Sequence, residues 1–288
     1  MLRSMKDLEN YAIGATDGPI GQVKDFYFDD QAWVIRYLVV EAGSWLSGRK
    51  VLISPMSVQH ADWAARLLPV AITQEQVRNS PDIDTQQPVS RQHERDHLGY
   101  YGHPYYWDGL GLWGEGRYPH AWMADHPATG VGRVEPDRRP AANTSAGTSA
   151  GTSAGVSAEA SAEASAESNR HRNDDPHLRS CQAIVGHHIH ATDGEIGHVD
   201  GMLVDDETWA ICYLVVNTSN WWMGHQVLLA PPWITGVHWS DRSVTVGLSR
   251  QAIRDAPAYD PSAPLNREQE TGLHDHHDRP VYWGSGGA

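Results

Sequence analysis

The sequence predicts a mainly β protein that contains two tandem small β-barrels, each followed by a short helix and an aromatic tail. Two observations lead to this fold class. The stretch Trp33–Val40 is rich in β-branched and aromatic residues and is apolar on both faces except at Arg36, which is typical of a strand covered on both sides. The same stretch returns as Trp209–Val216, 176 positions later, so we expect the whole unit to occur twice.

The repeat extends far beyond this strand and needs no gap. An Asp-Gly turn is found at Asp17-Gly18 and again at Asp193-Gly194. Further matching pairs at the same offset are Trp45 and Trp221, Pro55 and Pro231, Trp63 and Trp239, Arg91 and Arg267, Glu94 and Glu270, Tyr106 and Tyr282, and Trp107 and Trp283. We therefore predict the duplication of a unit of about 100 residues, which is an ordinary domain size.

This pattern divides the chain into three parts. Residues 1–123 are predicted to form the first barrel with its aromatic tail, and residues 177–288 the second barrel with a short tail. Residues 124–176 are predicted to be a flexible linker rich in Ala, Ser, Gly, Thr and Glu, because such a segment cannot offset its ordering entropy by burying apolar surface. We expect cleavage in this linker to release two separately folded halves.

Short strands and two short helices are predicted within the units. The strands of the first unit are Tyr11–Ala15, Gly21–Asp29, the central Trp33–Val40, Lys50–Ile53, and a hairpin of Val58–Trp63 with Leu67–Ile72. The spacing of the apolar residues in Gly21–Asp29 allows a bulge. In the second unit the hairpin consists of Thr235–Trp239 and Val244–Leu248. Thr73, with Gln76 as its capping-box partner, and Ser249 are expected to cap the helices.

These stretches resemble a known family. The segment Ile13–Val23, the strand Trp33–Val40 and the strand end Val51–Pro55, with their copies, are similar to the PRC-barrel family. That family includes the cytoplasmic domain of the photosynthetic reaction-centre H subunit, the C-terminal domain of the ribosome-maturation factor RimM and stand-alone bacterial proteins. We expect no counterpart of the membrane helix that precedes the H-subunit barrel. RimM pairs its barrel with a different N-terminal domain, whereas this sequence has two acidic units. The resemblance implies the fold, whereas a fold alone does not define a function.

The charge distribution argues against several classes of partner. The formal net charge is −14 and no Lys follows Lys50, so the basic stripe of a nucleic-acid-binding protein is missing and anionic lipid is disfavoured. The uncharged stretch Thr208–Ser240 is interrupted by polar residues and prolines, which excludes a membrane span. The N-terminus carries no apolar run of a secretory signal. We expect a cytoplasmic protein without direct membrane insertion, and peripheral contact with a membrane complex stays open.

Histidine is abundant, and two clusters could hold a metal ion. His93, His97 and His103 form the first cluster, and His274, His276 and His277 form the second. Because His93, His97 and His103 correspond to Gln269, Leu273 and Arg279, a metal site common to both units is not expected. We predict no metal and no cofactor, and we interpret both clusters as polar, solvated tails.

The remaining reactive side chains have simple structural interpretations. Asp17 and Asp193 head Asp-Gly turns. Cys181 and Cys212 lack metal-ligand spacing, and Cys212 is expected to be a packed, inert thiol. Nucleophile-elbow, P-loop and dinucleotide-binding motifs are missing from the sequence. We therefore predict no catalytic residue.

The aromatic residues provide the stronger case for binding. The Tyr-Trp pairs at 106–107 and 282–283 are expected to pack on their own barrels, because both units keep them. Trp45 follows the central strand of the first unit, and Trp221-Trp222 follows that of the second. In the second unit, Cys212, Asn217, His225 and Gln226 replace Arg36, Glu41, Arg49 and Lys50 of the first. Since interface cores are depleted of charge, the predicted contact surface comprises Trp45, Asn217, Trp221, Trp222, His225 and Gln226.

Taken together, the pattern predicts a non-catalytic cytoplasmic adaptor that docks protein partners or associates with itself, in a regulatory or stress-related role. An accessory of photosynthetic electron transfer, similar to the H-subunit domain, is the alternative. A metal-dependent enzyme that uses the tail histidines is the third hypothesis.

Overall fold

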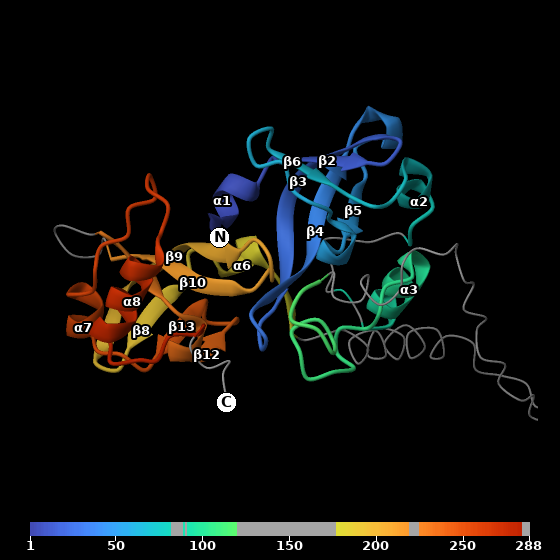
Figure 1. Cartoon of the computed structure of the whole chain (residues 1–288). Coiled ribbons are helices and arrows are strands. Elements are labelled where there is room, and N and C mark those ends of the chain that lie inside the picture. Colours follow the sequence, from blue (N-terminus) through green and yellow to red (C-terminus); the bar gives the residue numbers. More distant parts are fainter. Residues whose placement is uncertain (82–88, 90, 120–176, 219–224, 284–288) are drawn as a thin grey trace, which may run out of the picture.

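A computed structural model describes residues 1–81, 89, 91–119, 177–218 and 225–283 (Figure 1). We call residues 1–119 the first domain and residues 177–283 the second domain. The predicted linker, residues 124–176, lies outside the described residues, and so do Trp221 and Trp222. The chain is mainly β, with its strands in two sheets. In the described part of the chain, no helix is long and apolar enough to cross a membrane.

The sheet of the first domain has the strand order β5-β4-β3-β2-β6. Its strands are β2 (Ala12–Ala15), β3 (Gly18–Asp29), β4 (Val34–Ala42), β5 (Lys50–Ile53) and β6 (Leu67–Pro69). The apolar strand β4 lies between β3 and β5, which confirms its predicted central place. A register shift between Val23 and Asp25 leaves Lys24 as an extra residue of β3, which confirms that this strand is bulged. A second shift, between Tyr27 and Phe28, leaves Arg36 as an extra residue of β4.

The sheet of the second domain has the same order of equivalent strands, β11-β10-β9-β8-β13, with β12 added beyond β13. Its strands are β8 (His188–Ala191), β9 (Gly194–Asp205), β10 (Ile211–Asn217), β11 (Gln226–Leu229), β12 (Ile234–His238) and β13 (Ser243–Val246). The predicted hairpin is present here as β12 and β13. In the first domain the predicted outer arm of the hairpin, Val58–Trp63, is not a continuous strand. It is joined to β6 and to the residues after β6 by isolated bridges, Val58 to Val70 and Asp62 to Leu67.

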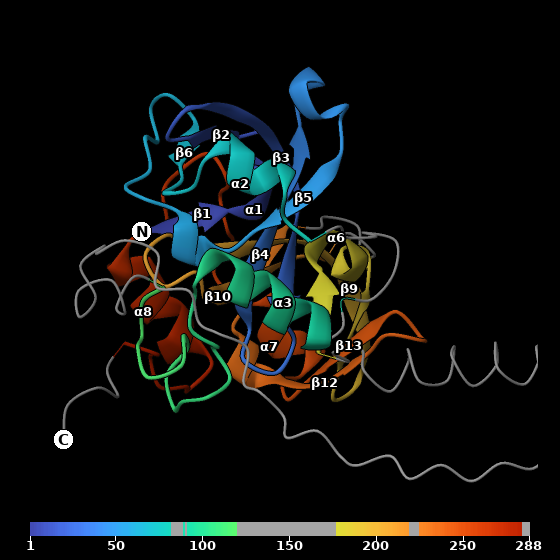
Figure 2. The same cartoon turned by 90° about the vertical axis from the view of Figure 1, so that its right-hand side faces the viewer.

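Short helices follow each sheet as predicted. Thr73 caps α2 (Gln74–Arg78) in a capping box with Gln76, and Ser249 caps α7 (Arg250–Arg254). The 3₁₀ turns η1 (Ser44–Leu46), η2 (Pro55–Ser57) and η3 (Pro231–Trp233) connect strands. Two longer tail helices, α3 (Arg91–Tyr101) and α8 (Arg267–His276), were not predicted from the sequence. Figure 2 turns α3 toward the viewer.

The core of each domain is built around its central strand. Tyr37 and Tyr213 are 0% exposed, as are Leu38 and Leu214, so the equivalent positions of β4 and β10 are buried in both domains. Trp33 does not belong to β4, because its φ of 54° is incompatible with a strand, and its ring packs instead at 5.5 Å from Phe28. Trp209 shares this conformation with a φ of 58°.

The two domains exchange their first strands. The segment β1 (Leu2–Ser4) pairs with β9 of the second domain, and β7 (Leu178–Ser180) pairs with β3 of the first. The following turns, α1 (Met5–Leu8) and α6 (Cys181–Ile184), lie against the same partner strands. Figure 1 shows the blue N-terminal end of the chain beside the yellow and orange strands of the second domain. Each sheet therefore contains a strand from the other half, which argues against the expected release of two separate halves, and the outcome of cleavage stays a prediction.

Candidate functional site

Each barrel holds its tail through a buried cluster of polar side chains, which we call the tail-anchoring cluster. In the first domain, α3 places Glu94 in the interior with 0% exposure. The hydroxyl group of Tyr106 donates a hydrogen bond to Glu94 Oε1. Arg91 Nη1 lies 3.4 Å from Glu94 Oε2 and donates to the Tyr106 hydroxyl at 3.2 Å. The tail is thus attached by a carboxylate whose charge is paired, as a buried carboxylate requires.

The second domain contains the same cluster at the offset of 176. Tyr282 donates to Glu270 Oε2 at 2.9 Å, and Arg267 Nη1 donates to Glu270 Oε1 at 3.1 Å. Tyr213 of the central strand also donates to Glu270 Oε2, at 3.1 Å. Its first-domain counterpart, Tyr37, has no hydrogen-bond partner among the described residues. The two clusters therefore differ in how the central strand takes part.

Burial controls the protonation of these tyrosines. Desolvation and the nearby glutamate raise the pKa of Tyr37 and of Tyr213 well above the usual range. Desolvation likewise raises the pKa of Tyr106 and of Tyr282. All four phenols stay protonated near neutral pH, so Tyr106, Tyr213 and Tyr282 act as hydrogen-bond donors that fix the tails.

The Tyr-Trp pairs pack on their own domains, as expected. Tyr106 is buried, and the Arg91 guanidinium lies 4.3 Å from the Trp107 ring centroid. Arg267 lies at 4.5 Å from the Trp283 ring in the equivalent arrangement. These aromatic side chains thus cover the anchoring clusters.

Position 36 differs in chemistry from its counterpart, position 212. Arg36 is only 3% exposed, and its guanidinium lies 3.9 Å from the Tyr106 ring centroid and 5.0 Å from that of Trp113. Its Nη2 lies 3.5 Å from Asp29 Oδ2. Arg36 is thus an interior residue and does not share a surface with Glu41, Arg49 and Lys50, with which the comparison of the two units grouped it. In the second domain the equivalent side chain is the short, uncharged Cys212.

A cavity of about 550 Å³ adjoins Cys212. Its walls come from the second domain and from the loop that ends the first domain. The second domain contributes Cys212, Asp205, Glu207, Tyr282 and Trp283, among others. Trp113 of the first-domain loop donates its indole N–H to the Thr208 carbonyl at 2.8 Å, so the loop is fastened to the second domain.

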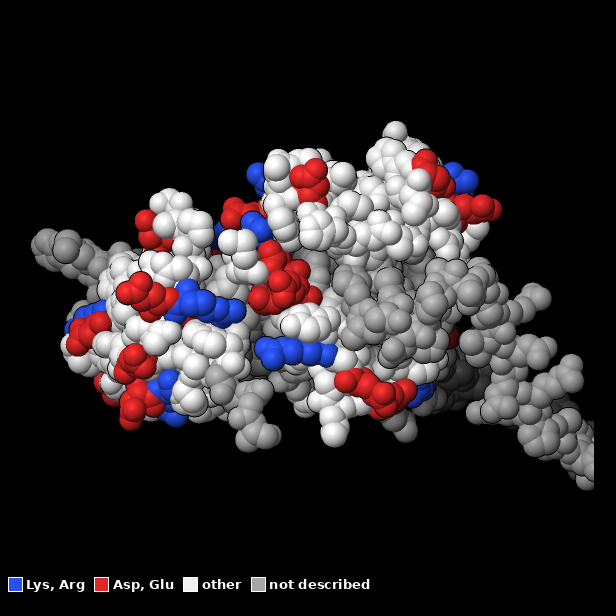
Figure 3. Space-filling view, in the orientation of Figure 1, with Lys and Arg blue, Asp and Glu red and all other residues white. Residues whose placement is uncertain are grey.

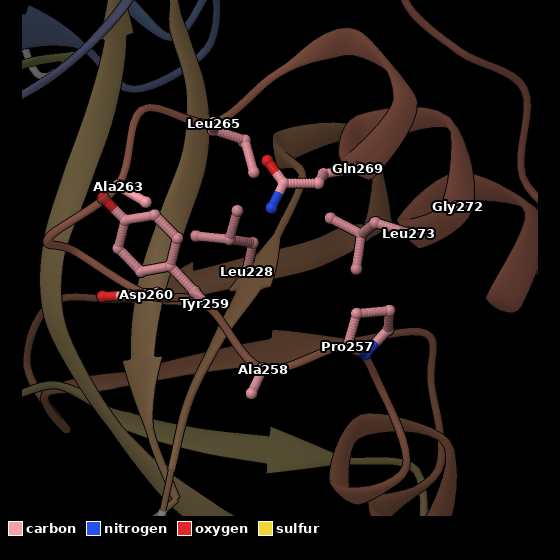
Figure 4. A pocket seen from close by; sticks show the side chains of 10 residues that line it. All are labelled: Leu228, Pro257, Ala258, Tyr259, Asp260, Ala263, Leu265, Gln269, Gly272 and Leu273. Carbon is pink, nitrogen blue, oxygen red and sulfur yellow. The ribbon is translucent and has the colours of Figure 1, made fainter.

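Other cavities lie elsewhere in the described part of the chain. One of about 650 Å³ lies between the domains, where Arg3, Trp63 and Trp209 contribute to its walls. Another, of about 170 Å³, lies between α8 and the preceding loop and is lined mainly by apolar side chains such as Leu228 and Leu265 (Figure 4).

The structure places the residues of the predicted contact surface on two different domains. Trp45 is half-buried, donates its indole N–H to the Ile20 carbonyl at 2.8 Å and so covers one end of its own barrel. Asn217 and Gln226 lie opposite each other on β10 and β11, and Gln226 Nε2 donates to Asp200 at 2.7 Å. His225 precedes β11 and is half-buried. Because Trp221 and Trp222 lie outside the described residues, the surface stays a prediction.

The interpretation of the histidines as solvated tails was wrong for four of them. His97, His103, His274 and His277 are buried. His97 Nε2 contacts the Leu52 carbonyl at 3.0 Å, and burial lowers the pKa of His97 to about 4. Burial also lowers the pKa of His277 to about 4. These side chains pack the tail helices onto the sheets, and no metal-binding group of three His, Cys, Asp or Glu side chains is found in the described part of the chain.

The other reactive side chains have structural roles. Asp17 and Asp193 accept hydrogen bonds from the backbone N–H groups of Gln74 and Arg250, at the starts of α2 and α7. Cys181 and Cys212 are free and buried, and burial raises the pKa of Cys212 to about 12. Both thiols are thus protonated and packed, in line with the expectation of an inert Cys212.

Sequence reasoning missed the anchoring clusters and the strand exchange. Arg91, Glu94 and Tyr106 recur at one offset, which was a usable signal, because a charged residue that recurs with its partners indicates a common structural role. For the strand exchange, the copies Leu2-Arg3-Ser4 and Leu178-Arg179-Ser180 indicate a common element but not which sheet receives it.

The fold defines a mainly β protein with barrel-like domains. Residues 5–67 match the family model of the PRC-barrel domain, a stretch that includes β2 to β5. This match confirms the predicted resemblance to the PRC-barrel family for the first unit. A search of curated proteins found no match. The family match supports a generic binding or adaptor domain.

Proposed function

We propose that this protein is a non-catalytic cytoplasmic adaptor that docks protein partners through two PRC-type barrels held in one fixed arrangement. The strand exchange is the observation that carries the proposal, because β1 and β7 set the distance and orientation of the two barrels. Two linked sites at a fixed spacing increase the effective concentration of the second binding event. A regulatory or stress-related role is a further part of the proposal.

The surface charge supports protein partners over nucleic acid. On the face drawn in Figure 3, Lys and Arg side chains of the described residues are interspersed with Asp and Glu side chains rather than aligned in a stripe. The net charge of −14 repels a phosphate backbone and favours a basic partner.

The polar interior supports a binding role over a catalytic one. In both domains the buried glutamate accepts a hydrogen bond from a tyrosine and forms an ion pair with an arginine of its own tail. The raised pKa values of the tyrosines and of Cys212 leave these groups protonated at neutral pH, which suits them poorly as general bases or nucleophiles.

A paired substitution tests the docking surface predicted around Asn217 and Gln226. Asn217→Glu with Gln226→Lys recreates the cross-strand pair Glu41 and Lys50 of the first domain, which occupies the same register. The fold should tolerate it, since the lysine introduced by Gln226→Lys can still contact Asp200. The immobilised wild-type chain should retain partner proteins from lysate of its own cells, and the variant should lose them.

The matched control is the reverse exchange, Glu41→Asn with Lys50→Gln, which should leave retention unchanged. Equal retention by both variants would place docking elsewhere, and retention of no specific protein by the wild type would contradict the adaptor role. Recovery of photosynthetic reaction-centre subunits would favour the alternative of an electron-transfer accessory.

A further inference from the structure

We infer that the cavity beside Cys212 is a receptor site for an arginine side chain of a partner protein. This site would be part of the proposed docking function, and the assignment of the arginine to a partner protein rests on that proposed function. It is based on an internal comparison, because the first domain already holds a guanidinium group in the equivalent place.

The two sites share one framework. The guanidinium carbon of Arg91 lies 5.6 Å from the Tyr106 ring centroid, and that of Arg267 lies 5.6 Å from the Tyr282 ring centroid. The distances to the adjacent tryptophan rings are 4.3 Å and 4.5 Å. The anchoring clusters therefore present their aromatic rings in the same way, and a difference between the sites arises at positions 36 and 212.

In the first domain the open face of this framework is filled from within. The Arg36 guanidinium stacks on Tyr106 at 3.9 Å and faces Asp29 Oδ2 at 3.5 Å. It also donates to the Leu112 carbonyl. A buried guanidinium is thus stabilised by an aromatic face, a carboxylate and a carbonyl oxygen, which is a suitable environment for this cation.

In the second domain the receiving groups remain but the guanidinium is absent. Asp205 and Tyr282 correspond to Asp29 and Tyr106, and both line the cavity of about 550 Å³ together with Cys212. Tyr282 is only half-buried, whereas Tyr106 is buried. The second domain has the short Cys212 where the first domain has the long Arg36, which accounts for the hollow. The hollow has an aromatic wall and a carboxylate, and it takes the place that the guanidinium group fills in the first domain.

The Asp205 carboxylate binds the following turn as its counterpart Asp29 does. Asp205 Oδ1 accepts hydrogen bonds from the turn that follows it, at 3.2 Å from Glu207 N and 2.9 Å from Thr208 N. Asp29 Oδ1 binds its own turn in the same way, which directs Oδ2 toward Arg36. Asp205 Oδ2 lies 3.8 Å from the Met1 amino group, which is itself bound to Asp206.

The other charged groups of the cavity are compatible with a second guanidinium. Glu207 contributes one more carboxylate, and Arg117 and Arg267 contribute positive charge. Arg267 is occupied by Glu270 and Tyr282, at 3.1 Å and 3.0 Å. In the first domain the equivalent Arg91 and Arg36 both lie on the Tyr106 ring. The presence of one guanidinium group in this framework therefore does not exclude a second one.

The experiment titrates the full-length chain with N-acetyl-arginine amide and follows binding by calorimetry and by the shifts of tryptophan indole N–H signals. We expect one equivalent to bind, and N-acetyl-lysine amide to bind at least about tenfold more weakly, because an ammonium group cannot stack as a planar guanidinium does. Cys212→Arg should abolish binding by filling the site from within. Asp205→Asn should weaken it by about tenfold, since the amide oxygen can still bind the turn while the charge is removed.

Asp29→Asn is the matched control, because Arg36 already fills the first site, and it should leave binding unchanged. If Cys212→Arg does not fold, Asp205→Asn decides the question. The assignment is overturned if the wild type does not bind, if neither second-domain variant alters binding, or if the blocked lysine binds equally well. Tighter binding of free arginine than of the blocked form would overturn the partner side chain as the source.

The two proposals fail in distinguishable ways. Binding of the blocked arginine without retention of any partner protein would support the site and contradict the adaptor role. Retention of partners that is equal for the wild type and for Cys212→Arg would support the adaptor role and overturn the site as their receptor.

Discussion

Val34 and Ala210 lie opposite each other in an antiparallel bridge that joins the two domains. The bridge is flanked by two equivalent hydrogen bonds, from Ile35 N to Trp209 O at 2.9 Å and from Ile211 N to Trp33 O at 2.7 Å. Positions 34 and 210 are themselves related by the offset of 176. The two domains thus meet at the same residues on both sides, as the subunits of an isologous dimer do.

The contacts around this bridge follow the same symmetry. Asp206 of the second domain forms an ion pair with Arg3 at 3.0 Å, and the Arg3 guanidinium lies 4.1 Å from the Trp63 ring. On the other side Asp30 lies 3.6 Å from Arg179, whose guanidinium is 4.9 Å from the Trp239 ring. Each exchanged strand is therefore held by a carboxylate and an indole as well as by its backbone.

The difference between the two central tyrosines predicts different responses to loss of the hydroxyl group. Tyr213→Phe should lower the free energy of unfolding by about 1–3 kcal/mol, because it removes a buried hydrogen bond to Glu270. Tyr37→Phe should leave this free energy nearly unchanged, since the Tyr37 hydroxyl has no partner among the described residues. Denaturant titration of both variants measures the difference, and an equal loss in both would contradict the described hydrogen bonding.

The central strands should be equally sensitive to truncation in both domains. Leu38 and Leu214 are 0% exposed, so Leu38→Ala and Leu214→Ala should each cost about 2–5 kcal/mol of stability. Chemical denaturation is again the measurement. The exposed Leu110→Ala serves as the control and should change little, and a comparably small change for a central leucine would show that its strand is not in the core.

Buried His97 should make stability depend on pH. Its folded-state pKa of about 4 lies below the ordinary value of 6.5, so the unfolded chain binds more protons between these pH values. The contribution is fully present above pH 6.5 and is lost as the pH falls toward 4. His97→Leu, which introduces the residue found at position 273, should flatten the stability curve over this range, whatever its cost in absolute stability. His60→Gln, at an exposed histidine, is the control, and a slope equal to wild type in His97→Leu would contradict the assignment.

The local structure could be predicted from the sequence because its causes are local. The alternation and β-branching of the central strand, the Asp-Gly turns and the caps Thr73 and Ser249 depend on neighbouring residues, and the structure confirms them. The tail helices α3 and α8 are different. Both are predominantly polar, and the side chains that they bury include Glu94 and His97 in α3 and Glu270 and His274 in α8, so a hydrophobic pattern could not indicate them.

The arrangement of the two domains could not be predicted for a different reason. A strand of three residues such as Leu2–Ser4 pairs equally well with an equivalent edge of either sheet, and the repeat makes the two edges alike in sequence. The choice depends on long-range contacts such as Arg3 with Asp206. The interior position of Arg36 was missed likewise, because only the folded tail shows that Tyr106 covers it.

Cleavage between the domains tests the interlocked arrangement most directly. A specific protease site placed within Ala141–Ser168 would be cut in the folded protein, and the mass of the product would be measured by sedimentation under native conditions. Because the halves share strands in both directions, they should sediment together at the mass of the intact chain, 31.8 kDa, and separate only in denaturant. Two folded species of roughly half that mass under native conditions would contradict the strand exchange and the fixed adaptor built on it.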